Sequence, residues 1–262
     1  MAITISCASI KGGCSKTTTA INLAAALAEQ GYRCLIVDFD PQANASLALN
    51  IPVDNLDYTV ADVLMPLKNG KTVPIEKAIY KTEFNNLHVV AAHLNLSLAS
   101  LMLNSVIARE SILRKELRKQ EVQKQYDFVF IDTAPAVDIL LINALAASDY
   151  VIGCSTCEFL SLTGVDLMLD QMQSLKDSDI NNSIKFLGVM ATKRNNTKHA
   201  KEVLETLENR YNLLGCTKTS TKANEATSEG MPVVCYAKKD AVSQEYKRVA
   251  EYLIDQFERD EL

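Results

Sequence analysis

The amino-acid sequence predicts an α/β fold, in which a single, mostly parallel, twisted sheet is flanked by helices. Residues 2–8 are apolar and β-branched and run into a glycine pair, which is typical of a buried strand that ends in a tight loop. Residues 16–30 follow with alanine and leucine at helical spacing, and Gly31 is placed to end that helix. Residues 34–37 then form a second buried strand. A strand, a helix and a strand in succession form a βαβ unit, so the two strands are expected to be parallel.

The same alternation continues along the chain. Further strands are expected at residues 87–91, 128–131, 150–154 and 185–190, and further helices at residues 108–125, 139–147, 159–175 and 198–211. Apolar residues between positions 242 and 257 fall at helical spacing, which predicts an amphipathic closing helix. The stretch 50–103 has the least regular pattern. No linker rich in proline, glycine or serine divides the chain, so residues 1–262 are expected to form one domain.

The composition is that of a globular protein, with 48% apolar and 23% charged residues among 262. The N-terminus lacks the basic segment of a secretory signal, and no apolar run approaches the roughly 20 residues of a membrane span. Seven scattered cysteines then favour reduced thiols and a cytoplasmic location. Cys154 and Cys157 form a lone CxxC, and zinc would need two further ligands nearby, so no metal role is expected for them.

The net charge of −5 argues against a protein that coats nucleic acid over its whole surface. The charge is uneven, however, because residues 181–248 hold 12 Lys and Arg against 7 Asp and Glu. This segment is a candidate polyanion face, with an ordinary solvated surface as the alternative. The candidate phosphate contacts are Lys185, Arg194, Lys198, Lys201, Lys218, Lys222, Lys238, Lys239, Lys247 and Arg248.

A candidate phosphate-binding loop lies between the first strand and the first helix. Glycines let backbone N–H groups approach an anion closely, and the helix N-terminus adds a partial positive charge. Lys16 supplies a full charge for the β- and γ-phosphates, and the Thr17 hydroxyl is placed to bind Mg²⁺. The sequence therefore predicts a site for ATP and Mg²⁺. Its phosphate-binding residues are expected to be Gly12, Gly13, Cys14, Ser15, Lys16, Thr17 and Thr18.

The loop departs from the common pattern G-x-x-x-x-G-K-S/T, because Ile10 and Ser15 stand where the two glycines belong. Its form K-G-G-x-x-K-T resembles the deviant Walker A loop of the ParA/MinD superfamily of P-loop NTPases, and the resemblance extends from about Ile3 to Leu253. The resemblance implies that Lys16 contacts the β- and γ-phosphates. It also implies that Lys11 is the signature lysine, which reaches the partner's phosphates across a nucleotide-sandwich homodimer.

Ser15 is the main departure from the family, which usually has glycine there. A Cβ atom makes a positive φ strained, so we expect the loop to avoid positive φ at Ser15. The other possibility is that the loop accepts the strain and that hydrolysis is slow.

Acidic residues follow two of the predicted strands. Asp38 and Asp40 resemble the family's D-x-D-P-Q segment, and Asp132 ends an apolar strand in the manner of a Walker B motif. An aspartate after an apolar strand is by itself more often a turn or a helix cap. The resemblance implies that Asp40 orients or activates the attacking water, that Asp38 lies near the water shell of Mg²⁺, and that Asp132 holds Mg²⁺ through water. The family continues D-x-P-P, whereas this chain has Ala134 at the first of those prolines.

The base pocket is the part that the resemblance defines least. Thr192 is the candidate adenine-recognising residue, and Lys218 stands where the family often has a proline. Glu158 and Phe159 open a segment that matches the family's E-Y/F-x-x-L-x-G helix start.

The resemblance implies an ATPase that dimerises on ATP, binds nucleoid DNA without sequence preference and positions a cargo, which could be a plasmid, a chromosome origin or a protein organelle. Hydrolysis is expected to be weak and to be stimulated by a small adaptor or centromere-binding protein. Because the chain opens on its first strand, a helix-turn-helix extension and operator binding are not expected. The expected location is cytoplasmic and nucleoid-associated.

Two alternatives stay open. One is an ATP-dependent dimerisation switch that hydrolyses hardly at all. The other is a MinD-like membrane-associated ATPase, which needs a basic amphipathic tail. Residues 256–262 are acidic and would be repelled by anionic lipid, so no membrane partner is expected.

Overall fold

A computed structural model describes residues 1–65 and 72–260 of the chain. The described strands are β1 (Ile3–Ala8), β2 (Cys34–Phe39), β3 (Ile79–Lys81), β4 (Leu87–Val90), β5 (Phe128–Thr133), β6 (Tyr150–Thr156), β7 (Lys185–Arg194) and β8 (Leu213–Lys218). They form one sheet in the order β3-β4-β2-β5-β1-β6-β7-β8. Neighbouring strands are parallel throughout, except that β3 runs antiparallel to β4. The predicted α/β fold with a mostly parallel sheet is confirmed.

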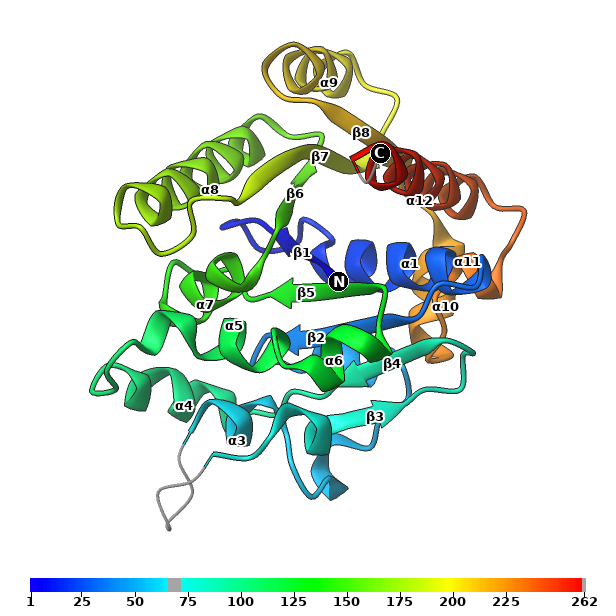
Figure 1. Cartoon of the computed structure of the whole chain (residues 1–262). Coiled ribbons are helices and arrows are strands. Elements are labelled where there is room, and N and C mark those ends of the chain that lie inside the picture. Colours follow the sequence, from blue (N-terminus) through cyan, green and yellow to red (C-terminus); the bar gives the residue numbers. More distant parts are fainter. Residues whose placement is uncertain (66–71, 261–262) are drawn as a thin grey trace.

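Helices cover both faces of this sheet (Figure 1). One face carries α1 (Lys16–Glu29), α11 (Val233–Tyr236) and α12 (Ala241–Asp260), which pack on alternate strand residues such as Cys34 and Ile36. The other face carries α3 (Val60–Leu64), α4 (Leu96–Leu103), α5 (Ile112–Leu117), α7 (Ile139–Ala147), α8 (Phe159–Asp177) and α9 (Lys198–Arg210). The remaining helices are α2 (Asn44–Leu47), α6 (Gln120–Gln125), α10 (Thr221–Ser228), and the short 3-10 turns η1 (Val53–Asn55), η2 (Ile75–Ala78) and η3 (Arg109–Ser111). Strands β2 and β5 are buried along their whole length, and both are apolar up to the aspartates near their carboxyl ends, as the sequence pattern predicted.

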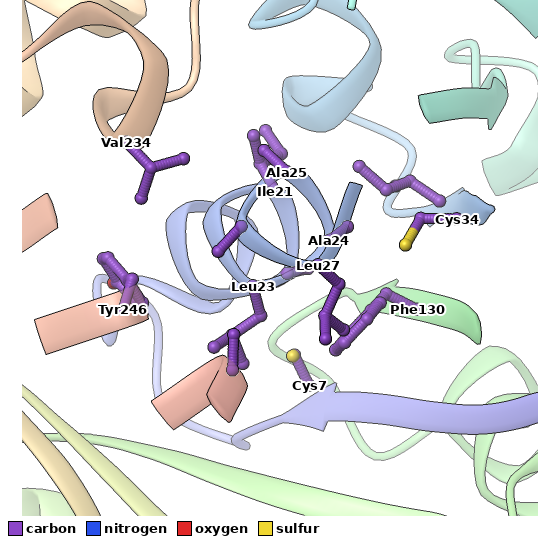
Figure 2. Close-up of a cluster of buried hydrophobic side chains, with 14 of the residues drawn as sticks. Cys7, Ile21, Leu23, Ala24, Ala25, Leu27, Cys34, Phe130, Val234 and Tyr246 are labelled. Carbon is purple, nitrogen blue, oxygen red and sulfur yellow. The ribbon is translucent and has the colours of Figure 1, made fainter. Parts of the chain in front are cut away.

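Helix α1 lies in the centre of the core. Its alanines leave little volume, so the helix approaches the sheet closely, while Leu23 and Leu27 fill the space toward the neighbouring elements. Figure 2 shows its side chains directed toward Phe130 of β5, Val234 of α11 and Tyr246 of α12. Each fully buried leucine contributes about 2 kcal/mol to the free energy of unfolding. The helix that begins at the phosphate loop is therefore held from several sides.

The element boundaries agree with the sequence in most places. Gly31 adopts φ 97° just after α1, as a helix-ending glycine should. The expected helix at 108–125 is instead η3, α5 and α6, because Lys119 is extended and interrupts it. Strand β7 continues past the expected residue 190 to Arg194, and β8 was not predicted. Part of the irregular stretch, residues 66–71, and the last two residues of the acidic end lie outside the described chain.

Candidate nucleotide-binding site

The carboxyl ends of β1, β2 and β5 meet at one edge of the sheet. In the register of the parallel pairs, Asp132 of β5 lies beside Cys7 of β1 and beside Asp38 of β2. The loop that follows β1 leads into α1, which begins at Lys16. The structure therefore brings together the loop, Asp38 and Asp132, as parallel strands require, because their carboxyl ends share an edge.

The phosphate loop contains two residues in the left-handed region. Gly13 has φ 76°, and Ser15 has φ 60° and ψ 34°. The expectation that the loop avoids positive φ at Ser15 is wrong. Ser15 is the N-cap of α1 but makes no side-chain capping bond, and its carbonyl accepts a hydrogen bond from the Thr19 N–H at 2.9 Å. A left-handed non-glycine residue costs about 1–2 kcal/mol, so contacts outside the loop must maintain this conformation.

Such contacts come from the end of β7. The Thr192 hydroxyl donates to the Cys14 carbonyl at 3.4 Å, and the Lys193 ammonium donates to the Gly13 carbonyl at 3.0 Å. The Thr192 hydroxyl also lies 3.4 Å from the Ser155 carbonyl, and the residue is 1% exposed. Its hydroxyl is thus engaged with the loop and with β6, while its role in base recognition stays a prediction.

Asp38 is fully buried and hydrogen bonded to its own loop. Its Oδ2 accepts from the Ser46 N–H at 2.8 Å and from the Ser46 hydroxyl at 2.7 Å, and its Oδ1 accepts from the Asp40 N–H at 3.3 Å. Burial raises the pKa of Asp38 to about 6 against the opposing effect of the Ser46 bonds, and the Asp40 charge raises it further. Asp38 therefore orders residues 40–46 in addition to any contact with the water shell of a metal.

Asp132 is the unsatisfied group of the site. The residue is fully buried, and neither carboxylate oxygen has a hydrogen-bond partner of good geometry among the described residues. Burial raises the pKa of Asp132 well above its ordinary value, and the Asp38 charge raises it further, against the Thr17 hydroxyl and the Lys16 ammonium. A buried carboxylate without a partner fits a cation, and Mg²⁺ keeps several waters while using only one or two protein carboxylates. The residues present therefore fit the predicted metal.

Asp40 lies after β2 at the same edge and is 8% exposed. Its Oδ1 accepts from the Gln42 N–H at 2.9 Å, which fixes the direction of the carboxylate. The other oxygen makes no hydrogen bond within the described chain. A fixed carboxylate with one oxygen available suits the predicted task of orienting water, which stays a prediction.

The two lysines of the loop differ in environment. Lys16 is buried, with 7% of its surface exposed, and its charge lies near Asp132. The Lys11 ammonium instead lies 2.7 Å from the Glu158 carboxylate and donates to the Ser161 hydroxyl at 3.1 Å. Lys11 is thus directed at α8 of its own chain.

A cavity of about 410 Å³ adjoins the loop at Ser15 and Thr18, and its size suits a base. Its other walls come from β7, β8, α10 and α12. Lys218, which stands where the family often has a proline, lines this cavity, and its role in a base pocket stays a prediction. The residues that sequence reasoning did not assign to it are Lys193, Thr217, Thr219, Ser220, Ala223, Asn224, Thr227, Val242 and Tyr246. Recognising β8 would have indicated Thr217, Thr219 and Ser220, because β8 and the loop after it line the cavity.

The two cysteines of the CxxC motif, Cys154 and Cys157, each interact with a different cysteine elsewhere in the chain. Cys154 is buried beside Cys7, and a hydrogen bond between the two thiols, together with burial, raises the pKa of Cys7. Cys157 instead interacts with Cys216 of β8. The two thiols of the motif therefore belong to two separate pairs.

Comparison with known proteins agrees with this geometry. A protein-family model described as an AAA domain matches residues 2–186. The chain is 34% identical over 256 residues to the chromosome partitioning protein ParA of Caulobacter vibrioides, a match that covers 95% of this chain and 92% of that protein. The chain belongs to the ParA/MinD family of P-loop ATPases.

Solved structures of this family superimpose on nearly the whole chain. Cobyrinic acid a,c-diamide synthase from Mycobacterium smegmatis, with bound ADP and magnesium, has a TM-score of 0.81 at 28% identity and covers 98% of this chain and 96% of its own. The septum site-determining protein MinD of Pyrococcus horikoshii, complexed with Mg-ADP, has a TM-score of 0.76 at 25% identity and covers 97% and 96%. Within residues 1–65 and 72–260, no helix is long and apolar enough to cross a membrane.

Proposed function

We propose that the chain is an ATPase that dimerises when ATP is bound, binds DNA without sequence preference and positions or segregates a cargo. ATP and Mg²⁺ are its cofactors, supported by the family, by relatives that hold ADP and magnesium, and by the unsatisfied Asp132 carboxylate beside Lys16 and Thr17. In the bound state the loop N–H groups and Lys16 hold the phosphates, and Asp40 orients the attacking water.

The proposed dimer is supported by the position of the exposed apolar side chains. Most of the large ones lie in segments that leave the carboxyl ends of parallel strands, at the edge that also holds the phosphate loop. Leucines and other apolar residues around α4, which Figure 1 shows at this edge, account for five of them. The set is Leu47, Leu94, Leu98, Leu101, Met102, Ile107, Val137, Phe159 and Leu160. Exposed apolar surface gathered on one face favours a protein interface, and the signature lysine lies on the same face.

The basic segment supports DNA binding only in part, because the structure pairs several of its members. Lys238 and Lys247 both contact Glu29, at 3.0 and 2.7 Å, and Arg248 contacts Glu245 at 2.9 Å. Lys222 lies 2.7 Å from Glu225, and Lys198 lies 3.8 Å from Glu202. Within the described chain, those without an ion pair are Lys185, Arg194, Lys201, Lys218 and Lys239. These five are the better candidates for phosphate contacts.

A dimer explains why DNA binding would depend on ATP. Two copies of a modest basic patch bind one duplex far more tightly than a single copy does, because the second contact is intramolecular. Neutralisation of DNA phosphates makes the affinity fall steeply with salt. A small adaptor or centromere-binding protein would then stimulate hydrolysis and release the DNA.

The second candidate is an ATP-dependent clamp that hydrolyses hardly at all. Ser15 favours it, because this residue holds a strained left-handed conformation where the family usually has glycine. Phosphate release with DNA and the adaptor present separates the two candidates, since a clamp stays at the rate of the buffer blank.

DNA binding by the wild type tests the main proposal. We would titrate a random-sequence duplex by fluorescence anisotropy with ATP and Mg²⁺, with ADP and Mg²⁺, and without nucleotide. We expect the duplex to bind only in the presence of ATP and Mg²⁺. The affinity should fall by at least about tenfold between about 50 and 200 mM salt. Equal binding in the presence of ADP would overturn it.

A further inference from the structure

We propose that Lys193 is a positioning residue of the phosphate loop, which fixes the Gly13 carbonyl and so holds Ser15 in its left-handed conformation. The inference rests on the proposed function only in that the loop is taken to bind nucleotide. It concerns a residue outside the loop, separated from Gly13 by 180 positions in the sequence.

The contact joins two unusual pieces of backbone. Ser15 has φ 60° and Lys193 has φ 55°, and neither residue is glycine. The register between β7 and β8 is irregular from Ala191 to Arg194, so the end of β7 departs from regular strand geometry where Lys193 lies. A left-handed non-glycine residue persists only where the surrounding structure determines it. The Lys193–Gly13 hydrogen bond, 3.0 Å long, and the Thr192–Cys14 hydrogen bond join the end of β7 to the two residues that precede Ser15.

The effect on the loop follows from the planarity of the peptide bond. In a trans peptide the C=O and the next N–H point in opposite directions. Lys193 and Thr192 draw the carbonyls of Gly13 and Cys14 toward β7. The N–H groups of Cys14 and Ser15 are therefore turned away from β7. These are N–H groups of the phosphate-binding loop, so a fixed carbonyl direction preorganises donors for an anion.

The two residues of β7 that contact the loop, Thr192 and Lys193, differ in burial. Thr192 is buried and makes a longer bond of 3.4 Å, whereas Lys193 is exposed and makes the shorter one. Lys193 also lines the cavity beside the loop, and its charge contributes to lowering the pKa of Glu158, the partner of Lys11. Because its side chain is exposed, its replacement should change the loop without opening the core.

The test is a double-mutant cycle between Lys193 and Ser15. Lys193→Met removes the hydrogen-bond donor and the charge while keeping a long side chain. Ser15→Gly removes the cost of the left-handed backbone, so that the loop no longer depends on Lys193 to maintain it. We would measure the Kd of Mg-ADP and of Mg-AMP-PNP by calorimetry for the wild type, both single variants and the double variant. Lys193→Met is expected to weaken both nucleotides by about fivefold, the scale of one hydrogen bond. In the Ser15→Gly background the same change is expected to cost about twofold or less.

Two further variants complete the experiment. Lys193→Arg keeps a donor and is expected to stay within about twofold of the wild type. Lys115→Met removes an exposed lysine of α5 that has no ion pair within the described chain, and it controls for lost positive charge. It is expected to leave both Kd values unchanged.

The cycle separates positioning from simple attraction. Equal losses for Lys193→Met in the two backgrounds would mean that the charge alone attracts the phosphates, and would overturn the inference. No loss in the wild-type background would overturn it as well. Failure of the wild type to bind either nucleotide would refute the proposed function itself, which is a distinct result.

Discussion

The Lys11 ammonium and the Glu158 carboxylate of the same chain form an ion pair 2.7 Å long. Helix α8 lies directly against the lysine, because a Cβ atom on Gly164 would be 3.4 Å from the Lys11 Cβ atom. In the proposed dimer, Lys11 would have to leave Glu158 before it could reach the phosphates of a second subunit. We therefore expect Glu158 to compete with the dimer for Lys11.

The first prediction concerns this competition. The two side chains are 32% and 66% exposed, so each ion pair is worth about 0.2–1 kcal/mol, and two are lost per dimer. Glu158→Gln is expected to tighten ATP-dependent dimerisation by about 2- to 30-fold in sedimentation measurements. Asp166→Asn breaks the exposed Asp166–Arg210 pair elsewhere on α8 and serves as the control. A weaker dimer in the glutamine variant would show that Glu158 contributes to the interface instead.

The second prediction concerns Asp40. Its carboxylate is oriented by the Gln42 N–H, and within the described residues it makes no hydrogen bond to the phosphate loop. Asp40→Ala is expected to lower the ATP turnover rate by about 100-fold or more while the Kd for ATP changes by less than about threefold. Phosphate release and calorimetry on the same preparation check both values. If the variant and the wild type both stay at the buffer blank, with DNA and adaptor present, the clamp is the correct function.

The third prediction concerns the stability of the nucleotide-free protein. The ordinary pKa of an aspartate is 3.8, and the folded state raises the pKa of Asp132 well above that value. As the pH rises above 3.8, the free energy of unfolding therefore falls, because the unfolded chain ionises this group more readily than the folded chain does. Asp132→Asn removes that charge and is expected to raise the free energy of unfolding by about 1–2 kcal/mol at pH 7.5, or the Tm by about 2–8 °C. The gain should disappear below the ordinary pKa, where both states are protonated. Thermal melts at several pH values check it.

The same substitution should weaken metal binding. Without the Asp132 carboxylate, Mg²⁺ is expected to raise the Tm of the ATP-bound protein much less than it does in the wild type. In the wild type the effect of Mg²⁺ should itself decline as the pH falls through about 6, where Asp38 takes up a proton. An Asp132→Asn protein that is less stable than the wild type at neutral pH would contradict the assignment of an unsatisfied charge.

The fourth prediction compares paired and unpaired lysines of the basic segment. Lys201→Ala and Lys239→Ala are each expected to lower DNA affinity by about threefold and to reduce the salt slope by about one. Lys238→Ala and Lys247→Ala are expected to have smaller effects, because both side chains pair with Glu29, which offsets one of their two charges. Anisotropy titrations with ATP at several salt concentrations check this. Equal effects for all four would show that Glu29 is displaced when DNA binds.

The neighbouring placement of Asp38 and Asp132 could be predicted because it follows from local patterns and one general rule. Each aspartate ends an apolar strand, and the ends of parallel strands meet at one edge. The Lys193–Gly13 contact could not be predicted in this way. It joins segments 180 positions apart, and neither β8 nor the irregular end of β7 leaves a periodic signal.

The error at Ser15 has the same origin. The preference of a non-glycine residue against positive φ is a local rule, and it takes no account of the carbonyl contacts that β7 makes from a distant part of the sequence. Helix α4 is a second example, because residues 96–103 are apolar on nearly every side. Leu96 and Leu103 are buried, whereas Leu98 and Leu101 face solvent, and only the fold distinguishes them.

Helix α1 determines which parts of this protein can move. Its residues from Thr19 to Ala28 are buried, and β1, β2, β5, α11 and α12 all contact it. A helix enclosed in a close-packed interior cannot slide without opening voids around it. The phosphate loop is therefore attached to a helix that the surrounding core holds in place. We therefore expect any response to a bound γ-phosphate to arise in segments that follow the strands, such as residues 40–46 and α4, and not in α1 itself.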